Sequence, residues 1–380
     1  MFKVKLIVKV LFYRFFSLLP VADNRVLFYS YYGEHYSGSP KYISEYLSVD
    51  ENLSIIWAFT QPDKYTNIQN CKIIKYGSLK YYYYLATSGT IVTNYRQTKE
   101  FKRRKKQKYI QTWHSSLRLK MIEKDAEETL KPNYIKMAQS DSNEISYLIS
   151  GSQKSSEIFR QSFWYDGEIV PTGTPQCDLF FDNIQVEKCK EKVRNHYNLT
   201  SKEKIILYAP TFRKDYTTDA YIKDFNELKR AFEDALNSNV VFLIRLHPHM
   251  INLTDLIEYN DFVLQATNYD DPQELLCAAD VLISDYSAIM FDYMLTKRPC
   301  FLYVTDLEKY IKNDRNLYFD INKLPFVICT SFEKIVNNIY NFNNAEYQKK
   351  LSDFLEQIGS FDDGKSCERI KNIIEGKYNE

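Results

Sequence analysis

The chain has 380 residues, which is long enough for two domains of ordinary size. Its apolar fraction of 44% supports well-buried sheets, and its formal net charge of +1 excludes the basic excess typical of a nucleic-acid binder. The seven cysteines are scattered without a C-x-x-C pair, which predicts reduced thiols in a cytoplasmic protein and no zinc site.

The N-terminal segment, residues 1–20, is apolar and carries four cations, which are Lys3, Lys5, Lys9 and Arg14. It lacks the small-residue cleavage site of a secretory signal and is too charged to span a membrane comfortably. Bulky apolar residues mixed with cations favour a helix that lies in the headgroup region of an anionic membrane. Because the cations do not gather on one helical face, a helix docked on the N-terminal domain is the alternative.

Through the first half of the chain, apolar runs rich in β-branched and aromatic residues alternate with helical patterns. This rhythm predicts βαβ units and a parallel sheet. The expected strands are 25–30, 54–59, 71–76, 90–93, 109–113, 147–150 and 168–171, and the expected helices are 40–47, 79–86 and 153–163. Residues 101–108 hold six cations, which indicate either a solvated loop or a second contact with anionic lipid.

A turn at 172–175 and a charged helix at 186–197 predict a connection between two domains. The alternation then restarts, with strands expected at 205–209, 240–246, 281–284 and 300–304 and helices at 224–236, 272–278, 287–295, 332–339 and 346–376. We therefore expect an N-terminal segment at 1–20, a first domain at 21–180 and a second domain at 181–380.

Several expected strands end in side chains that are suited to phosphate chemistry. In an open α/β sheet, ligands bind at the carboxyl ends of the strands. These ends hold His114, Thr211 with Arg213, Arg245 with His247, and Ser284 with Asp285 and Ser287.

Histidine is the usual general base for a hydroxyl nucleophile, and arginine gives a bidentate contact to phosphate. For a lone histidine or arginine, a core or surface position is the plainer interpretation. Two of the five histidines, His114 and His247, stand at strand ends in different halves of the chain, which favours a functional role.

Ser287 opens the expected helix 287–295, and a helix N-terminus offers free N–H groups and partial positive charge to a diphosphate. The alternative is that Ser287 only caps this helix. Arg315 follows the helix and is expected to reach the same place.

Together these residues resemble the CDP-glycerol:poly(glycerophosphate) glycerophosphotransferase family of teichoic-acid and capsule enzymes. The resemblance covers about residues 25–325 and is carried by Gln111-Thr-Trp-His114, Gly173-Thr-Pro175 with Asp178, Ala209-Pro-Thr-Phe-Arg213, Arg245-Leu-His-Pro248, Ser284-Asp-Tyr-Ser287 with Phe291-Asp292, and Arg315. The chain departs from the family pattern at Ser115 and Leu117, where glycine and proline are usual, and at Gln176, where arginine is usual.

The resemblance implies an α/β, GT-B-like fold, in which two Rossmann-like domains with parallel sheets face each other across a cleft. It implies transfer of glycerol phosphate or ribitol phosphate from a CDP-polyol to a hydroxyl of a lipid-linked glycan or polyol-phosphate acceptor, with release of CMP. It also implies a peripheral position on the cytoplasmic face of the bacterial membrane.

On this basis His114 and His247 are the expected catalytic residues. The donor diphosphate is expected to contact Thr211, Arg213, Arg245, Ser284, Asp285, Ser287 and Arg315. No cofactor and no metal site are expected, and no nucleic acid. Two rival interpretations remain, a GT-B nucleotide-sugar glycosyltransferase or epimerase and a non-catalytic membrane scaffold.

Overall fold

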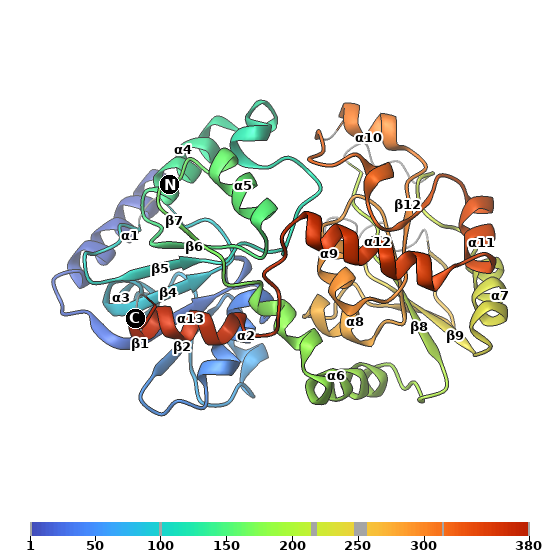
Figure 1. The fold of residues 1–380 in the computed structure, drawn as a ribbon. Coiled ribbons are helices and arrows are strands. Elements are labelled where there is room, and N and C mark those ends of the chain that lie inside the picture. Colours follow the sequence, from blue (N-terminus) through green and yellow to red (C-terminus); the bar gives the residue numbers. More distant parts are fainter. Residues whose placement is uncertain (1, 99–100, 214–218, 247–256, 314, 379–380) are drawn as a thin grey trace. The chain divides into compact units, whose positions relative to one another are not determined.

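The structure is a computed structural model that describes residues 2–98, 101–213, 219–246, 257–313 and 315–378. Contacts within the chain divide it into two compact units. Unit 1 comprises Met1–Ser116, Ile122–Asp178 and Ser360–Glu380, and unit 2 comprises Leu117–Met121 and Leu179–Gly359. Each unit holds a parallel sheet with helices packed on it (Figure 1).

The sheet of unit 1 has seven strands in the order β3-β2-β1-β4-β5-β6-β7, and the pairs of neighbours are parallel. Buried parallel strands are apolar on both faces, which explains the near-continuous hydrophobic runs of the sequence. The strands are β1 (Ala22–Tyr29), β2 (Ser54–Phe59), β3 (Lys72–Lys75), β4 (Ser88–Thr93), β5 (Lys108–Gln111), β6 (Tyr147–Ile149) and β7 (Glu168–Val170).

Helices α2 and α13 lie side by side and share one hydrophobic core with the first sheet (Figure 1). Ile43 and Leu47 of α2 and Ile370 of α13 are fully buried in it, against strand residues such as Phe28 and Trp57. The helices of unit 1 are α1 (Phe2–Phe16), α2 (Gly38–Leu47), α3 (Leu79–Thr87), α4 (Pro132–Ser142), α5 (Gln153–Ser162) and α13 (Ser366–Glu375).

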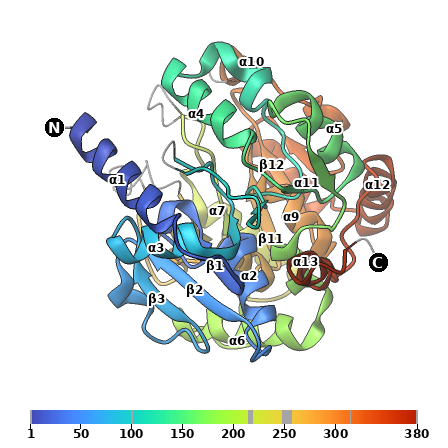
Figure 2. The same cartoon turned by 90° about the vertical axis from the view of Figure 1, so that its left-hand side faces the viewer.

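The N-terminal helix α1 packs beside α3 (Figure 2). Tyr13 is buried, and its hydroxyl donates to the carbonyl of Lys102. Leu11 and Phe15 are 57% and 63% exposed, and Leu18, just after the helix, is 82% exposed, so α1 is docked on one side and exposes apolar side chains on another. No helix among the described residues is long and apolar enough to cross a membrane.

The basic run beside α1 is divided between structural and exposed cations. Arg103 donates to the carbonyl of Glu144, and Arg104 donates to the carbonyl of Ala86. Lys108 binds the last carbonyls of α13, where a cation complements the helix dipole. Lys105 and Lys106 are exposed. Lys102 also pairs with Glu144, so four of the six cations bond to other parts of unit 1.

The sheet of unit 2 has six strands in the order β10-β9-β8-β11-β12-β13, again with parallel pairs. Helices α7 and α11 pack on one hydrophobic face through Phe232 and Ile335. The strands are β8 (Lys204–Tyr208), β9 (Val240–Ile244), β10 (Val263–Gln265), β11 (Val281–Ser284), β12 (Cys300–Tyr303) and β13 (Val327–Cys329). The helices are α6 (Asn183–His196), α7 (Phe225–Leu236), α8 (Pro272–Ala278), α9 (Ile289–Tyr293), α10 (Leu307–Asn313), α11 (Phe332–Tyr340) and α12 (Asn344–Gln357).

The C-terminal region differs from the single helix expected at 346–376. It forms α12 and α13, separated by residues 358–365, because Gly359 and Gly364 adopt left-handed backbone angles that interrupt a helix. Residues 360–380 belong to unit 1, whereas the sequence placed them with the second domain.

Candidate active site

The turn after β5 carries His114 at the carboxyl edge of the first sheet. Trp113 has a φ of 53°, which is strained for a bulky aromatic residue. The side chain of Gln111 secures this turn, because its oxygen accepts from the Trp113 N–H at 3.0 Å. The imidazole of His114 is half-buried, and its ring centroid lies 4.5 Å from that of Trp113.

Tyr95, which follows β4, lies beside His114 and is itself packed against two tyrosines that follow β1. Tyr95 lies 5.8 Å from the imidazole, and Tyr31 and Tyr32 lie 5.1 and 5.0 Å from Tyr95. Burial raises the pKa of Tyr32 to about 12 and also raises the pKa of Tyr95. Both half-buried phenols therefore stay protonated at neutral pH.

A buried ionic cluster, which sequence reasoning missed, lies behind this turn. Arg96 is 2% exposed and binds Glu123 at 2.7 Å and Asp141 at 3.0 Å. Burial by itself lowers the pKa of Arg96, but the two carboxylates outweigh burial and raise it. The guanidinium also lies 4.1 Å from the ring of Phe163 and 5.7 Å from the ring of Trp113. Arg96 is therefore a fixed cation behind the turn that carries His114.

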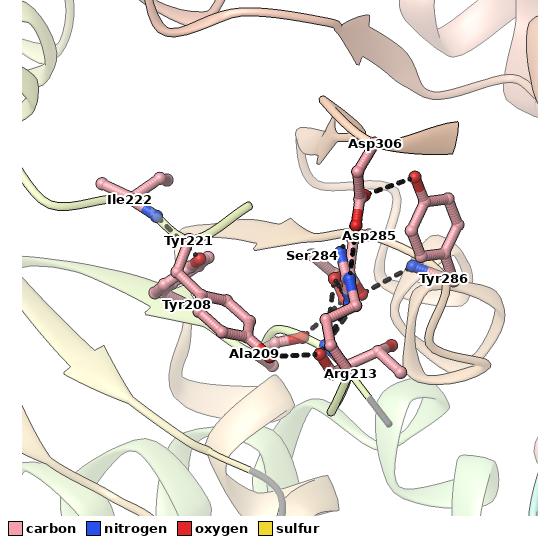
Figure 3. A network of polar contacts seen from close by, with 10 residues as sticks. Tyr208, Ala209, Arg213, Tyr221, Ile222, Ser284, Asp285, Tyr286 and Asp306 are labelled. Atoms are coloured by element: carbon pink, nitrogen blue, oxygen red, sulfur yellow. Dashed lines mark hydrogen bonds and ion pairs between the residues drawn. The ribbon is translucent and has the colours of Figure 1, made fainter. Parts of the chain in front are cut away.

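In unit 2, Arg213 is held by two carboxylates (Figure 3). Its Nη1 donates to Asp285 at 2.9 Å, and its Nε and Nη2 donate to Asp306 at 2.7 and 3.1 Å. Burial lowers the pKa of Arg213, but Asp285 and Asp306 raise it by more. The hydroxyl of Tyr286 donates to Asp306, and its ring stacks on Tyr310 at 3.9 Å. The strand-end arginine is thus 4% exposed and bonded within the protein.

The three hydroxyls at the same edge differ in their hydrogen bonds, and Figure 3 shows that of Ser284. Ser284 is fully buried and donates to the carbonyl of Ala209 at 2.7 Å, so it ties β11 to the end of β8. The Oγ1 of Thr211 is buried and has no hydrogen-bond partner among the described residues. Helix α9 begins at Ile289, two residues later than expected, and Ser287 accepts from its N–H at a long 3.4 Å.

The remaining predicted donor contacts, Arg245, Arg315 and His247, lie in other segments of the chain. Arg245 follows β9, and its Nη1 donates to the carbonyls of Ala266 and Tyr269 at 3.2 and 2.6 Å. Arg315 is half-buried in the segment after α10. The predicted catalytic His247 lies outside the described residues. Unit 2 thus brings Thr211, Arg213, Ser284, Asp285 and Ser287 together at the ends of β8 and β11.

The segment directly after the His114 turn belongs to unit 2. The Met121 N–H donates to Asn316 at 2.9 Å, and the Tyr318 N–H donates to Leu119 at 2.7 Å. Burial lowers the pKa of Arg118, in the same segment, to about 9, against the opposing effects of Tyr318 and Asp292. The sequence offered no signal for this buried cation, because the segment reads as an ordinary loop.

The Gly173-Thr-Pro motif anchors the last helix. Gly173 has a φ of 85°, and a Cβ atom there would lie 2.4 Å from the Ser366 hydroxyl. Asp178 accepts from the N–H groups of Ser366 and Cys367 at 3.1 and 2.7 Å, which caps α13. This part of the resemblance therefore has a structural role that the sequence did not reveal. No group of three metal-ligating side chains is found in the parts of the chain that the structure describes.

Two α/β units, each with a sheet of parallel strands and polar residues at its strand ends, define a GT-B-like protein, as predicted. A family model described as CDP-Glycerol:Poly(glycerophosphate) glycerophosphotransferase matches residues 11–376, so the chain belongs to this family. The resemblance inferred from the motifs is confirmed.

Relatives and solved structures agree with this assignment. The chain is 33% identical to a teichoic acid poly(glycerol phosphate) polymerase of Staphylococcus epidermidis, over 93% of this chain but only 51% of that protein. It is 29% identical to a polymerase of the same name from Bacillus spizizenii, over 96% and 95% of the two chains. The chain thus spans about half the length of the first relative and nearly all of the second. The wall teichoic acid polymerase TagF, in a variant soaked with CDPG, aligns with a TM-score of 0.85 and 31% identity, over 99% of this chain and 96% of that chain.

Proposed function

We propose that this protein transfers a polyol phosphate from a CDP-polyol to a hydroxyl of a growing or lipid-linked acceptor in teichoic-acid-type polymer synthesis. The observation that carries the proposal is membership of the family along residues 11–376, together with a histidine at the carboxyl edge of the first sheet. The relatives named above act on poly(glycerol phosphate) by name, which favours glycerol phosphate over ribitol phosphate as the transferred group.

In the proposed reaction, the acceptor oxygen attacks the β-phosphorus of the CDP-polyol. A new P–O bond forms, the bond from that phosphorus to the bridging oxygen breaks, and CMP leaves with the electron pair. His114 takes the proton of the attacking hydroxyl. Phosphoryl transfer needs mainly positioning and stabilisation of charge, so no covalent protein intermediate is invoked.

Unit 2 is proposed to bind the CDP part of the donor. The buried Thr211 hydroxyl, Ser287 before α9, and the cations Arg245 and Arg315 are the groups proposed to meet the diphosphate, with His247 beside them. Arg213, Ser284 and Asp285 bond to one another or to backbone, which supports a role in holding the strand ends at fixed positions.

We further propose that the protein works at the cytoplasmic face of the membrane on a lipid-linked acceptor. Leu11, Phe15 and Leu18 are exposed, and Tyr13 of the same helix contacts Phe101 and Lys102 at the start of the basic run, in which Lys105 and Lys106 are exposed. Apolar side chains and cations both contribute to binding at an anionic interface. This supports an interfacial role for the outward side of α1.

The test is to incubate the purified chain with CDP-glycerol, CDP-ribitol or a UDP-sugar, each with an oligo(glycerol phosphate) acceptor, and to follow release of CMP or UDP. We expect acceptor-dependent CMP release from a CDP-polyol and no UDP release. UDP release alone would favour a sugar transferase, and no release from any donor would favour a non-catalytic role.

A further inference from the structure

Gln111 makes three hydrogen bonds at the end of β5, although it is fully buried. Its oxygen accepts from the Trp113 N–H at 3.0 Å. Its Nε2 donates to the carbonyl of Tyr95 and to the hydroxyl of Tyr109, both at 2.9 Å. One amide therefore joins β5, the segment after β4, and the strained residue that precedes His114.

The chemistry of its partners determines which way this amide points. An ionised carboxylate only accepts hydrogen bonds, so Tyr109 uses its single hydroxyl hydrogen for Asp141, at 3.0 Å. The Tyr109 oxygen is then left as an acceptor, and only the NH₂ side of Gln111 can serve it. The amide oxygen must face the Trp113 N–H.

Arg96 holds the far end of this chain of contacts. It binds Asp141 at 3.0 Å and Glu123 at 2.7 Å, so Asp141 is paired with a cation that is itself fixed. These contacts form a buried hydrogen-bond network in which each bond constrains the next. The network runs from Arg96 through Asp141, Tyr109 and Gln111 to Trp113. It ends at the backbone of the residue beside His114.

We propose that Gln111 is a positioning residue that sets the direction of the His114 imidazole, with Tyr109, Asp141 and Arg96 as its anchor. The inference rests on the proposed role of His114 as the base. A left-handed tryptophan persists only when its surroundings fix it, and here the Gln111 oxygen supplies that constraint. A general base works only within hydrogen-bond reach of the proton that it removes, so a shift of this turn lowers turnover.

Gln107 provides a matched control. It is 2% exposed, precedes the same strand at its opposite end, and also makes three hydrogen bonds through its amide. Its Nε2 donates to the carbonyls of Leu85 and Ser88 at 3.0 and 2.8 Å, and its oxygen accepts from the Arg104 N–H at 3.1 Å. Gln107→Met and Gln111→Met therefore remove comparable buried amides, at the end of the strand away from His114 and at the end beside it.

Both variants are expected to lower the melting temperature of the full-length protein. Gln111→Met should also lower kcat at least tenfold, because a misplaced base loses part of the 10²–10⁴-fold that a general base typically contributes. The Kd of CDP-glycerol should stay within about twofold of the wild-type value. Gln107→Met should keep kcat within about threefold. An equal loss of kcat in both variants, or no loss in Gln111→Met, would overturn the inference.

If no transfer is observed, that result counts against the proposed function and not against the role of Gln111. The position of the His114 imidazole is then followed by NMR. In protein with ¹³C-labelled histidines, the His114 resonance is assigned by its loss in His114→Gln. We expect this resonance to shift in Gln111→Met and not in Gln107→Met, and an unshifted resonance would refute the positioning role. Tyr109→Phe, which removes only the hydroxyl that orients the amide, should shift it in the same direction and serves if Gln111→Met does not fold.

Discussion

Replacing Arg213 by methionine should destabilise unit 2 by leaving two carboxylates without their shared cation. The guanidinium and the Asp285 carboxylate are each 4% exposed, and that of Asp306 is 15% exposed. Asp285 keeps the Thr211 and Tyr286 N–H groups as donors, and Asp306 keeps the Tyr286 hydroxyl. Neither has another side-chain cation bonded to it among the described residues, so both negative charges lose their main compensation.

Removing one partner of a buried ion pair costs about 3–5 kcal/mol, because an uncompensated charge stays behind. The partial exposure of Asp306 and the remaining donors place the expected loss near the lower end, at about 3 kcal/mol. For a unit of this size each kcal/mol lowers the melting temperature by roughly 2–4 °C, so a fall of roughly 6–12 °C is expected.

The assay is differential scanning calorimetry of Arg213→Met beside Arg230→Met, an exposed arginine on α7 of the same unit. The control should melt close to wild type, because surface substitutions usually cost within about 0.5 kcal/mol. Adding Asp306→Asn to Arg213→Met should recover part of the loss by removing one unpaired charge. The reasoning would be refuted if Arg213→Met melted within about 1 °C of wild type. It would also be refuted if the double variant with Asp306→Asn melted at a lower temperature than Arg213→Met alone.

His114→Ala should leave the affinity for CDP-glycerol intact, measured by calorimetry, and lower kcat about 10²–10⁴-fold, whereas unchanged turnover would remove His114 as the base. Gly173→Ala should lower the melting temperature of unit 1, because the new Cβ meets a hydroxyl at 2.4 Å and the φ of 85° disfavours alanine; an unchanged melting curve would contradict this. Replacing Leu11, Phe15 and Leu18 by serine should weaken sedimentation with anionic vesicles while the protein stays folded. Equal binding by the triple variant and the wild type would exclude these side chains as the membrane-binding surface.

The alternation of strands and helices was predictable because buried parallel strands leave a strong apolar pattern. The expected strand 54–59 coincides with β2, and the expected helix 79–86 lies within α3. Strands β10 and β13, of three residues each, were missed, whereas the equally short β6 and β7 were predicted. A strand of this length has too few residues for its period alone to identify it. Helix α4 was missed because its polar composition gives only a weak apolar stripe.

The strand-end positions of the candidate residues were also predictable, because the carboxyl edge of a parallel sheet collects polar side chains. Their bonding partners were not. Asp306 lies 93 residues from Arg213, and Asp141 lies 45 residues from Arg96, and neither acid stands in a recognisable pattern. Pattern reasoning finds the residues that interrupt an apolar run, but it carries no information on which distant loop supplies the opposite charge.

The charges at the strand-end edge of unit 2 determine which residues could attract the diphosphate of a donor bound there. Arg213 brings one positive charge, and Asp285 and Asp306 bring two negative charges, so this buried cluster is net negative beside the place proposed for a diphosphate. Like charges at short range repel, and more strongly where water is excluded. Attraction for the diphosphate must therefore come from cations outside the cluster, and Arg245 and Arg315 are the candidates among the described residues. Arg213, although it stands in a phosphate-type motif, holds a strand end through Asp285 and Asp306, and the anion contacts remain proposed for Arg245 and Arg315.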